Sequence, residues 1–449
     1  MIVIAPALPV TGSRPGVADR VVVLGLGAAV AYAALAQGGF YGRQAVTVLV
    51  LVAVAAVARV LTRRPVGRPV AIAAACWVLL AGWALVSGLI HADVGAAVPT
   101  AAVSCGLAAS ALAASGLLAE SRRILLSVVL AVAAVVALSC WVGVALHLEP
   151  LALPSSGLWR ASSTITYANA TAAFLVVALV LAVTVVPPGL LTNGLAAVLL
   201  LGLATTMSRA GALGLAVAAV VCAFLIRDVA RWRRFMPVLP AVAVAFVGLL
   251  PSLPVGGAAQ PLPALAGLVV GAAVLVVGGR LRLRHLALVA VLAVALLLVL
   301  PTGRGLVGHA AAGIATTRLT ATSDERADLT RVTAAQFWSS PLTGVGPGLL
   351  NLHYVDHTGA PVHAQYTHDE FLQTATETGV VGLALALAGA VALAAGAVRR
   401  RTPEAAAALA ILAGFAVHSA FDFLWHVPVL PLLMTLAVAS LTTDRQEHV

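Results

Sequence analysis

Long apolar runs separated by short polar connections make up most of this chain. About fourteen runs of roughly 17 to 25 residues follow one another, and a helix of that length crosses a hydrocarbon core of about 30 Å. The pattern therefore predicts an all-α fold, a polytopic membrane helix bundle of about 12 to 14 transmembrane helices. The predicted spans are roughly 20–37, 45–62, 69–90, 96–119, 124–147, 165–187, 190–207, 210–226, 235–251, 262–279, 285–301, 378–398, 405–426 and 428–442.

One long hydrophilic segment, about residues 302–377, interrupts this pattern. It divides the chain into residues 1–301 with eleven spans, residues 302–377 as a loop with short helices, and residues 378–449 with three spans and a short tail. A loop of this length among otherwise short connections is usually functional or disordered. Its helical patterning favours function.

The composition agrees with a membrane protein and excludes a soluble globular domain. Hydrophobic residues make up 61% and charged residues 9% of the 449 positions, against roughly half and a quarter in soluble domains. The net charge of +10 does not indicate a nucleic-acid partner, because the arginines cluster between spans, as membrane orientation requires. The cysteines all fall within predicted spans without metal-ligand spacing: Cys76, Cys105, Cys140 and Cys222.

The arginines also predict a topology for the cytoplasmic (inner) membrane. If the N-terminus is cytoplasmic, every arginine cluster falls in an inside loop, so both termini are cytoplasmic and the 302–377 loop is external. Orientation does not explain the arginines on the opposite face, which makes them candidates for function. They are Arg43, Arg160, Arg209, Arg304, Arg318, Arg326 and Arg331.

The stretch AQYTHDEFLQTATETG places His368 at the edge of a span. Thr367 is a plausible N-cap, and Glu370 would complete a capping box, so His368 would be the first helical residue. A helix N-terminus disfavours positive charge on the imidazole, which would leave His368 neutral and able to act as a general base. The alternative is that His368 merely decorates an interfacial cap.

Two further features of the loop leave alternatives open. His353 and His357 lie one helical turn apart, with His363 nearby, which would suit a zinc site, but the H-E-x-x-H pattern is missing and a metal is disfavoured. The glycine-rich stretch 344–348, GVGPG, predicts a tight turn in preference to a phosphate-binding loop, because no neighbouring lysine accompanies it.

A helix is predicted upstream of this turn. Ser323, followed by two acids, resembles a helix start; the helix would run to about Trp338 and end before Pro341. Helical spacing would place four of its residues on one face: Arg326, Thr330, Thr333 and Phe337.

Three charged residues outside the loop are also candidates for function. Arg209 in SRAG would lie in a short external turn, partly shielded from water, and Arg160 lies just before span six. Interfacial arginines suggest a functional site with an anionic partner, although an ordinary anchor is the alternative. In HSAFDFLWH the spacing of four would place Asp422 with His418 and His426 on one face of a span. There Asp422 would neutralise an external arginine. A structural ion pair is favoured over a catalytic role.

Several of these motifs together resemble the O-antigen ligase and O-antigen polymerase superfamily of membrane glycosyltransferases. HDEFLQTATETGVVGL follows an upstream PLTGVGPG, and SRAGALGL, TYANATAAFL and FDFLWHVP also resemble recurring motifs of that family. The family pattern of a histidine, ten residues and a glycine is met by His368 and Gly379. The resemblance covers roughly residues 155–442.

The resemblance implies a helix bundle of the GT-C kind and a transferase that needs no metal or other cofactor. Such enzymes move a glycan from a polyprenyl-diphosphate carrier to a hydroxyl of a glycan or lipid acceptor, among membrane lipids at the outer face of the cytoplasmic membrane. By position, His368 would be the base, and Arg209 and Arg326 would hold the diphosphate, with Arg331 as a competitor of Arg326. The resemblance further implies substrate binding by Arg160, Tyr167, Asn169 and Asp422.

Two rival functions remain at this stage. A transporter or lipid-linked glycan flippase is disfavoured because the spans are nearly free of charge, whereas transporters place ionisable groups at the bilayer midplane. An inactive relative that organises polysaccharide assembly is the other. Ligase and polymerase share these motifs, and the pattern leaves the acceptor, the sugar and the oligomeric state open.

Overall fold

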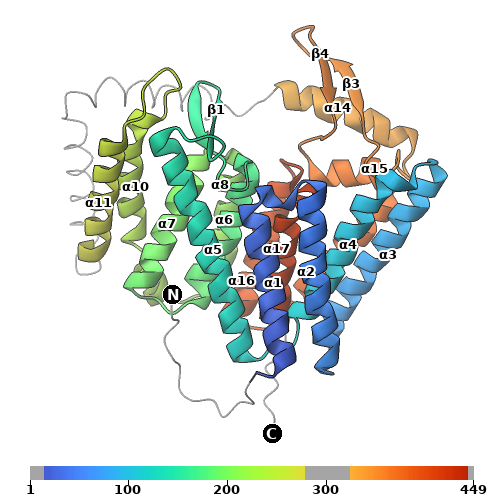
Figure 1. Ribbon diagram of the computed structural model, residues 1–449, viewed down its shortest axis with the longest axis horizontal. Coiled ribbons are helices and arrows are strands. Elements are labelled where there is room, and N and C mark those ends of the chain that lie inside the picture. Colours follow the sequence, from blue (N-terminus) through green and yellow to red (C-terminus); the bar gives the residue numbers. More distant parts are fainter. Residues whose placement is uncertain (1–14, 279–323, 443–449) are drawn as a thin grey trace.

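A computed structural model describes residues 15–278 and 324–442, which form a helix bundle with two small β-hairpins (Figure 1). The α-helices in these two ranges are α1 (Val17–Leu35), α2 (Gly42–Leu61), α3 (Arg68–Ile90), α4 (Val94–Ala114), α5 (Ala119–Leu146), α6 (Ala168–Val185), α7 (Leu190–Thr206), α8 (Arg209–Leu225), α9 (Val229–Arg233), α10 (Val238–Leu249), α11 (Pro261–Gly278), α14 (Asp324–Ser339), α15 (Glu370–Val398), α16 (Pro403–Ser419) and α17 (Val429–Thr442). Short 3₁₀ turns are η1 (Gln37–Gly39), η2 (Leu250–Ser252) and η3 (Leu424–His426).

The predicted all-α membrane architecture is confirmed. Within the described ranges, nine helical segments are long and apolar enough to cross a membrane, and α7, α8, α16 and α17 are shorter apolar helices. Each predicted span in these ranges overlaps one of them, although α15 begins at Glu370, before the predicted start at 378, and α16 ends at Ser419, before the predicted end at 426. The predicted span 285–301 lies outside the described residues.

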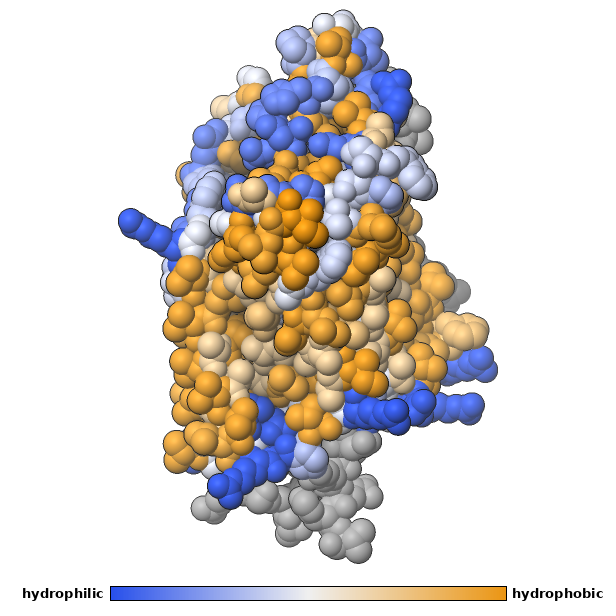
Figure 2. Space-filling model, turned by 90° about the vertical axis from the view of Figure 1, so that its right-hand side faces the viewer, coloured by the Kyte–Doolittle hydropathy of each residue, from blue (hydrophilic) through white to orange (hydrophobic). Residues whose placement is uncertain are grey.

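The surface agrees with a membrane-embedded bundle. On the face that Figure 2 shows, a broad hydrophobic band crosses the middle of the molecule, with hydrophilic residues gathered above and below it. Both hairpins and α14 lie at one end of the bundle, which we call the polar end (Figure 1). The opposite end is where α1 begins and α2 ends.

Two helices form the centre of the bundle. Sixteen of the 18 residues of α6 are buried, and α17 is buried along its whole length. Close helix approach supports this packing: a side chain at Gly214 of α8 would meet the Gly414 carbonyl of α16 at 2.9 Å. Small residues permit such contacts between helices in membranes. Both α6 and the loop before α17 begin at the polar end. The two most buried helices therefore hold the polar residues at that end in place.

The two hairpins were not predicted from the sequence. In the first, Ser156 and Gly157 link the strands, and both have positive φ (53° and 77°), as a two-residue hairpin turn requires. The second extends from the polar end above α15. The antiparallel strands are β1 (Ala152–Ser155), β2 (Leu158–Ala161), β3 (Leu352–Val355) and β4 (Pro361–Ala364).

Helix α15 bends at Gly379, where φ is 69° and ψ is 179°. A Cβ atom on Gly379 would approach the Leu342 carbonyl to 1.9 Å, and one on Gly344 would approach the Glu377 carbonyl to 2.3 Å. The Val380 amide donates to the Pro341 carbonyl at 2.8 Å. Two backbone segments thus touch at a corner that only glycine fits, which positions the first turns of α15 across the end of the bundle (Figure 1).

Candidate functional site

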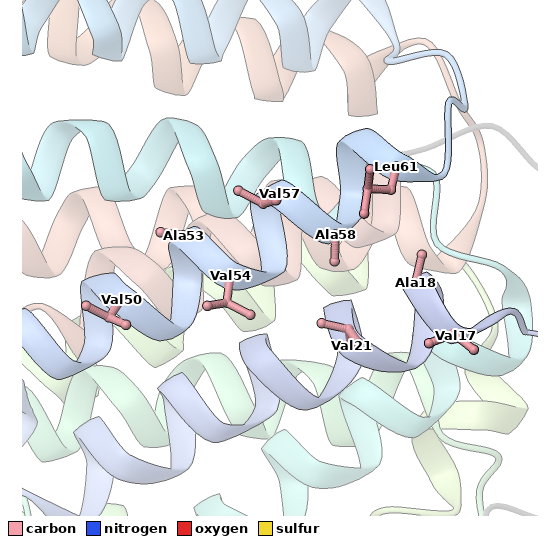
Figure 3. A pocket seen from close by; sticks show the side chains of 9 residues that line it. All are labelled: Val17, Ala18, Val21, Val50, Ala53, Val54, Val57, Ala58 and Leu61. Atoms are coloured by element: carbon pink, nitrogen blue, oxygen red, sulfur yellow. The ribbon is translucent and has the colours of Figure 1, made fainter.

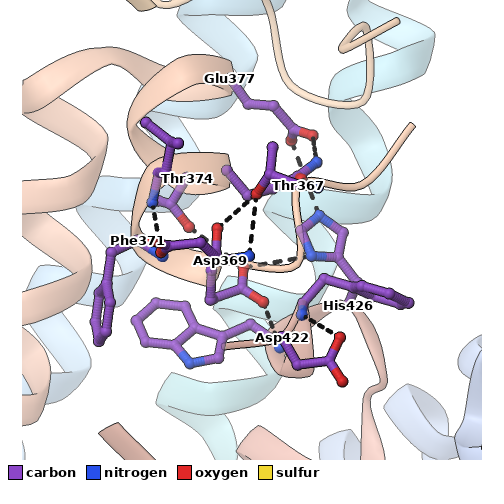
Figure 4. A network of polar contacts seen from close by, with 12 residues as sticks. Thr367, Asp369, Phe371, Thr374, Glu377, Asp422 and His426 are labelled. Atoms are coloured by element: carbon purple, nitrogen blue, oxygen red, sulfur yellow. Dashed lines mark hydrogen bonds and ion pairs between the residues drawn. The ribbon is translucent and has the colours of Figure 1, made fainter. Parts of the chain in front are cut away.

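His368 lies just before α15, and the predicted start of this helix is wrong by two residues. Asp369 is the N-cap, since its carboxylate accepts from the amides of Phe371 and Leu372 at 3.0 and 3.1 Å (Figure 4). Thr367 instead bonds to the backbone of Asp369. His368 is therefore outside the helix, immediately before its N-cap.

His368 has a left-handed backbone conformation with φ of 52°. This conformation is uncommon for residues other than glycine, and strained residues cluster at functional sites. It turns the imidazole towards the loop after α16, where Nδ1 lies 2.9 Å from Oδ1 of Asp422. The His368 side chain keeps 36% of its surface exposed, whereas the Asp422 side chain is fully buried. The imidazole thus joins a buried carboxylate to the surface.

Asp422 accepts several hydrogen bonds besides that of His368. The Tyr167 hydroxyl lies 2.7 and 2.6 Å from its two oxygens, and the Asn169 amide nitrogen donates to Oδ2. Burial raises the pKa of Asp422, but the hydrogen bonds and charge of His368 and the bonds from Tyr167 and Asn169 outweigh burial and lower it overall. Asp422 is therefore an anion that favours a proton on Nδ1 of His368.

The sequence had suggested an arginine as the partner of Asp422, and a face shared with His418 and His426. The structure differs because α16 ends at Ser419. The chain leaves the helix there, so Asp422 turns to His368, and His426 lies in η3.

Arg160 on β2 is connected to Asp422 through one side chain. Its guanidinium donates to Oδ1 of Asn169 and to the Thr206 carbonyl, and Asn169 in turn donates to Asp422. The Ser208 hydroxyl also donates to Oδ1 of Asn169, at 2.9 Å. Arg160 therefore belongs to the same network as His368, which we call the rim network: His368, Asp422, Tyr167, Asn169, Arg160 and Ser208.

Arg209 adjoins the rim network at the start of α8. Ser208 caps this helix by accepting from the Gly211 amide at 3.1 Å, and Arg209 is its first residue. The Arg209 side chain is exposed, so the expectation that it is shielded from water is wrong. A short turn had suggested depth, but the cap presents the side chain at the surface.

The two candidate arginines of α14 have different surroundings. Arg331 is exposed and forms an ion pair with Asp328 at 2.5 Å, and Asp328 also accepts from the His357 amide at 2.8 Å. Arg331 thus belongs to the contact between α14 and the β3–β4 hairpin. Arg326 also lies on α14 and is only partly exposed.

The helix α14 itself is confirmed, but its predicted face is not. Thr330 is exposed, and the buried positions are Asp328, Leu329 and Thr333. Leu329 packs with Leu350 and Leu352 in a small apolar cluster. The predicted start at Ser323 lies outside the described residues, as do Arg304 and Arg318.

The histidines of the loop lie on a hairpin and not on a helix. His353 and His363 face each other across β3 and β4, with ring centroids 4.5 Å apart. His357 lies in the connection between the strands and contacts Asp328. Helical spacing between His353 and His357 is therefore lost. In residues 15–278 and 324–442, no group of three His, Cys, Asp or Glu residues is placed to hold a metal.

The GVGPG stretch is a turn whose amides are occupied by α15. The Val345 amide donates to the Thr376 carbonyl at 2.8 Å, and the Gly346 amide to the Glu377 carbonyl at 3.1 Å. The Gly348 amide reaches the Glu377 carboxylate at 3.2 Å. These contacts favour the turn interpretation over a phosphate-binding loop.

A second buried cluster lies beside the rim network (Figure 4). His426 is 3.3 Å from Glu370 and 3.9 Å from Glu377, and Glu370 also accepts from the Trp425 amide at 2.7 Å. Burial lowers the pKa of His426, but the two carboxylates outweigh burial and raise it to about 10. We call His426, Glu370 and Glu377 the acid–imidazole cluster. Sequence spacing gave no signal for it, because His426 is about fifty residues from the two glutamates.

An apolar groove of about 670 Å³ lies between α1 and α2 (Figure 3). It extends from Val50 to the opposite end of the bundle, at Val17 and Leu61, and its lining is entirely Val, Ala and Leu. The other ends of α1 and α2 approach the polar end, where the Gln37 amide donates to the Thr164 carbonyl. The groove is therefore separate from the rim network.

Comparison with known proteins agrees with the motif resemblance. Residues 262–387 match the family model described as O-Antigen ligase, a range that includes His368, Arg326 and both corner glycines. A search of curated proteins finds no match. The matched segment and the multi-pass helix bundle support what the motifs suggested, a resemblance of this membrane protein to the O-antigen ligase superfamily.

Proposed function

We propose that this protein is a glycosyltransferase that moves a glycan from a polyprenyl-diphosphate carrier to an acceptor hydroxyl. The observation that carries the proposal is the pair formed by His368 and the buried anion Asp422 at the polar end. With Nδ1 held by Asp422, Nε2 of His368 is the nitrogen available to take a proton. General bases of this kind contribute about 10² to 10⁴ in rate.

In the proposed reaction, the acceptor hydroxyl gives its proton to Nε2 of His368 as its oxygen bonds to the reacting carbon of the donor sugar. The bond from that carbon to the diphosphate oxygen breaks, and the electron pair leaves with the polyprenyl diphosphate. Asp422 stabilises the imidazolium that forms.

Arginines at the polar end would bind the departing diphosphate. Arg160 is joined to Asp422 through Asn169, Arg209 follows Ser208 of the same network, and Arg326 lies on α14 at the polar end. Guanidinium groups stay charged and bind phosphate oxygens through several donors. Such stabilisation of developing charge is often the largest catalytic contribution. We propose that it takes the place of a metal ion here.

We further propose that the polar end faces outward from the cytoplasmic membrane, with both termini in the cytoplasm. The arginine clusters of the short loops support this orientation, since loops rich in arginine remain inside. A polyprenyl tail would then lie among the spans while its diphosphate meets the rim network at the interface. Whether the acceptor is a lipid or a growing glycan decides between ligase and polymerase.

Reconstitution of the full chain tests the proposal. Proteoliposomes receive a labelled polyprenyl-diphosphate glycan together with the delipidated glycan fraction of the same cells, and release of polyprenyl diphosphate is measured with and without EDTA. We expect release coupled to a longer or newly attached glycan, unaffected by the chelator. Movement of intact donor across the bilayer without release would indicate a flippase, and loss of activity in EDTA would restore the zinc hypothesis.

Two arginine variants, compared in the same experiment, test the diphosphate site. Arg209→Ala is expected to weaken carrier binding and slow release, because a donor of the diphosphate site is lost. Arg233→Ala, at an exposed arginine at the end of α9, is the matched control and should leave both unchanged. Equal behaviour of the two variants would reject Arg209 as a binding residue.

A further inference from the structure

Five aromatic rings form a continuous row beside the rim network. Tyr167 stacks on Phe423 with ring centroids 5.3 Å apart, and Tyr366 stacks on Phe423 at 4.3 Å. Phe40 lies 6.3 Å from Tyr366 and 5.4 Å from Tyr41. We call these five residues the aromatic row. Its rings come from four separate segments of the chain, so neighbouring positions in the sequence do not explain it.

The row leads from the buried network to the surface. Tyr167 bonds to Asp422, and the His368 ring lies 5.1 Å from that of Phe423. At the other end, Phe40 is 37% exposed and Tyr41 is 54% exposed, where α1 connects to α2. Of the five rings, only Tyr167 packs against the main apolar core. Burial of apolar area therefore does not account for the outer part of the row.

Aromatic side chains at a membrane interface often act as lipid anchors. Anchors of that kind need no contact with one another or with an imidazole. Here the rings contact one another in series, and His368, the residue proposed as the base, lies against Phe423. The position of the aromatic row next to His368 indicates a role in binding a substrate of the reaction.

Aromatic faces suit carbohydrates. The ring face carries partial negative charge, which attracts the C–H bonds on the apolar face of a pyranose, and tyrosine offers a hydroxyl for hydrogen bonding. Tyrosine also provides a large contact area at low cost in side-chain entropy. A row of rings therefore presents successive binding surfaces to successive sugars.

We propose that the aromatic row is a glycan-binding track that guides the acceptor to His368, an inference that rests on the proposed function. In a displacement, the attacking hydroxyl and the leaving diphosphate lie on opposite sides of the reacting carbon. The contacts of Asp422 lead through Asn169 to Arg160, on the diphosphate side. The row instead leaves His368 through Phe423, which assigns it to the acceptor.

The test measures acceptor and donor kinetics separately in the same proteoliposomes. Phe40→Ala and Tyr41→Ala are the informative variants because both side chains are exposed. We expect each to raise the KM for the delipidated glycan fraction about two- to tenfold, with the donor KM and kcat unchanged. Phe40→Trp should restore the wild-type value.

Tyr32→Ala provides the matched control, since Tyr32 is also exposed, at 38%, but lies outside the row. Unchanged acceptor KM in Phe40→Ala and Tyr41→Ala would overturn the track. A rise in donor KM that depends on prenyl length would also overturn it, because the row would then hold the carrier tail.

Binding without turnover separates this inference from the proposed function. Equilibrium dialysis of the labelled glycan fraction, with no donor present, should show weaker binding to Phe40→Ala and Tyr41→Ala than to wild type. That result supports the track even if the wild type releases no polyprenyl diphosphate, which would count against the proposed function alone. Equal binding of all proteins would reject the track.

Discussion

An aspartate side chain is buried at each end of the bundle, but the two have different partners. At the end opposite the polar end, Arg64 forms a bidentate pair with Asp19 at 2.6 and 2.8 Å. Arg59 donates at 2.8 Å to the Ser115 carbonyl and to the Thr62 hydroxyl. These contacts join α1, α2 and the end of α4, and one carboxylate balances the arginine that it meets.

In the rim network the buried carboxylate accepts hydrogen bonds from groups other than a bidentate arginine. Asp422 is shared by a tyrosine hydroxyl, an amide and an imidazole, and that imidazole is partly exposed. The anion therefore acts on a group that can still exchange a proton with a ligand. A buried charge is therefore not by itself a sign of function. A functional role is indicated when its hydrogen bonds lead to a titratable group at the surface and do not all end inside the protein.

The largest expected effect is on the rim side of this comparison. Asp422→Asn keeps the shape of the side chain but removes the charge that orients and stabilises the His368 imidazole. We expect kcat to fall about 10²- to 10³-fold while carrier binding stays the same. Initial rates of polyprenyl diphosphate release and carrier binding to the purified variant measure the two quantities. A fall of less than threefold would mean that Asp422 only supports the fold.

Asp19→Asn makes the same chemical change at the opposite end. It leaves Arg64 without its counter-charge, and we expect the free energy of unfolding to drop by about 1 to 3 kcal/mol, a moderate loss because Arg64 is 26% exposed. The kcat of the folded enzyme should not change. Thermal unfolding in detergent and release rates below the transition temperature check this. Lost activity in a fully folded protein would contradict the division between the two networks.

The smallest expected effect concerns the acid–imidazole cluster. Because the pKa of His426 is raised from 6.5 to about 10, its stabilising contribution is complete below about pH 6.5 and is lost as the pH rises towards 10. His426→Gln should therefore unfold at a lower temperature than wild type at pH 6, by about 2 °C, and the difference should vanish near pH 10. A difference that stays constant or grows with pH would show that His426 is neutral in the folded protein.

The sequence predicted the spans well because length and hydropathy are local signals. It mistook the end of α16, because FDFL continues the apolar run although the helix stops at Ser419. It also placed His368 inside a helix, because a capping box at Thr367 and a cap at Asp369 are nearly indistinguishable by residue type. The pairing of His368 with Asp422 joins positions 54 residues apart, and no spacing rule reaches that far.

The bend of α15 was partly visible in the sequence. The family pattern required Gly379, but its reason lies in the approach of the Leu342 carbonyl, which only the folded chain supplies. The aromatic row and the acid–imidazole cluster arise in the same way, from segments that meet only after the bundle has formed.

The most direct measurement of the central claim compares turnover and carrier binding in His368→Ala. Purified wild type and variant in proteoliposomes receive the labelled carrier glycan; bound carrier and released polyprenyl diphosphate are both quantified. If Nε2 of His368 is the base, the variant folds and binds the carrier like wild type but releases the diphosphate about 10² to 10⁴ times more slowly. Wild-type release by the variant would contradict the account.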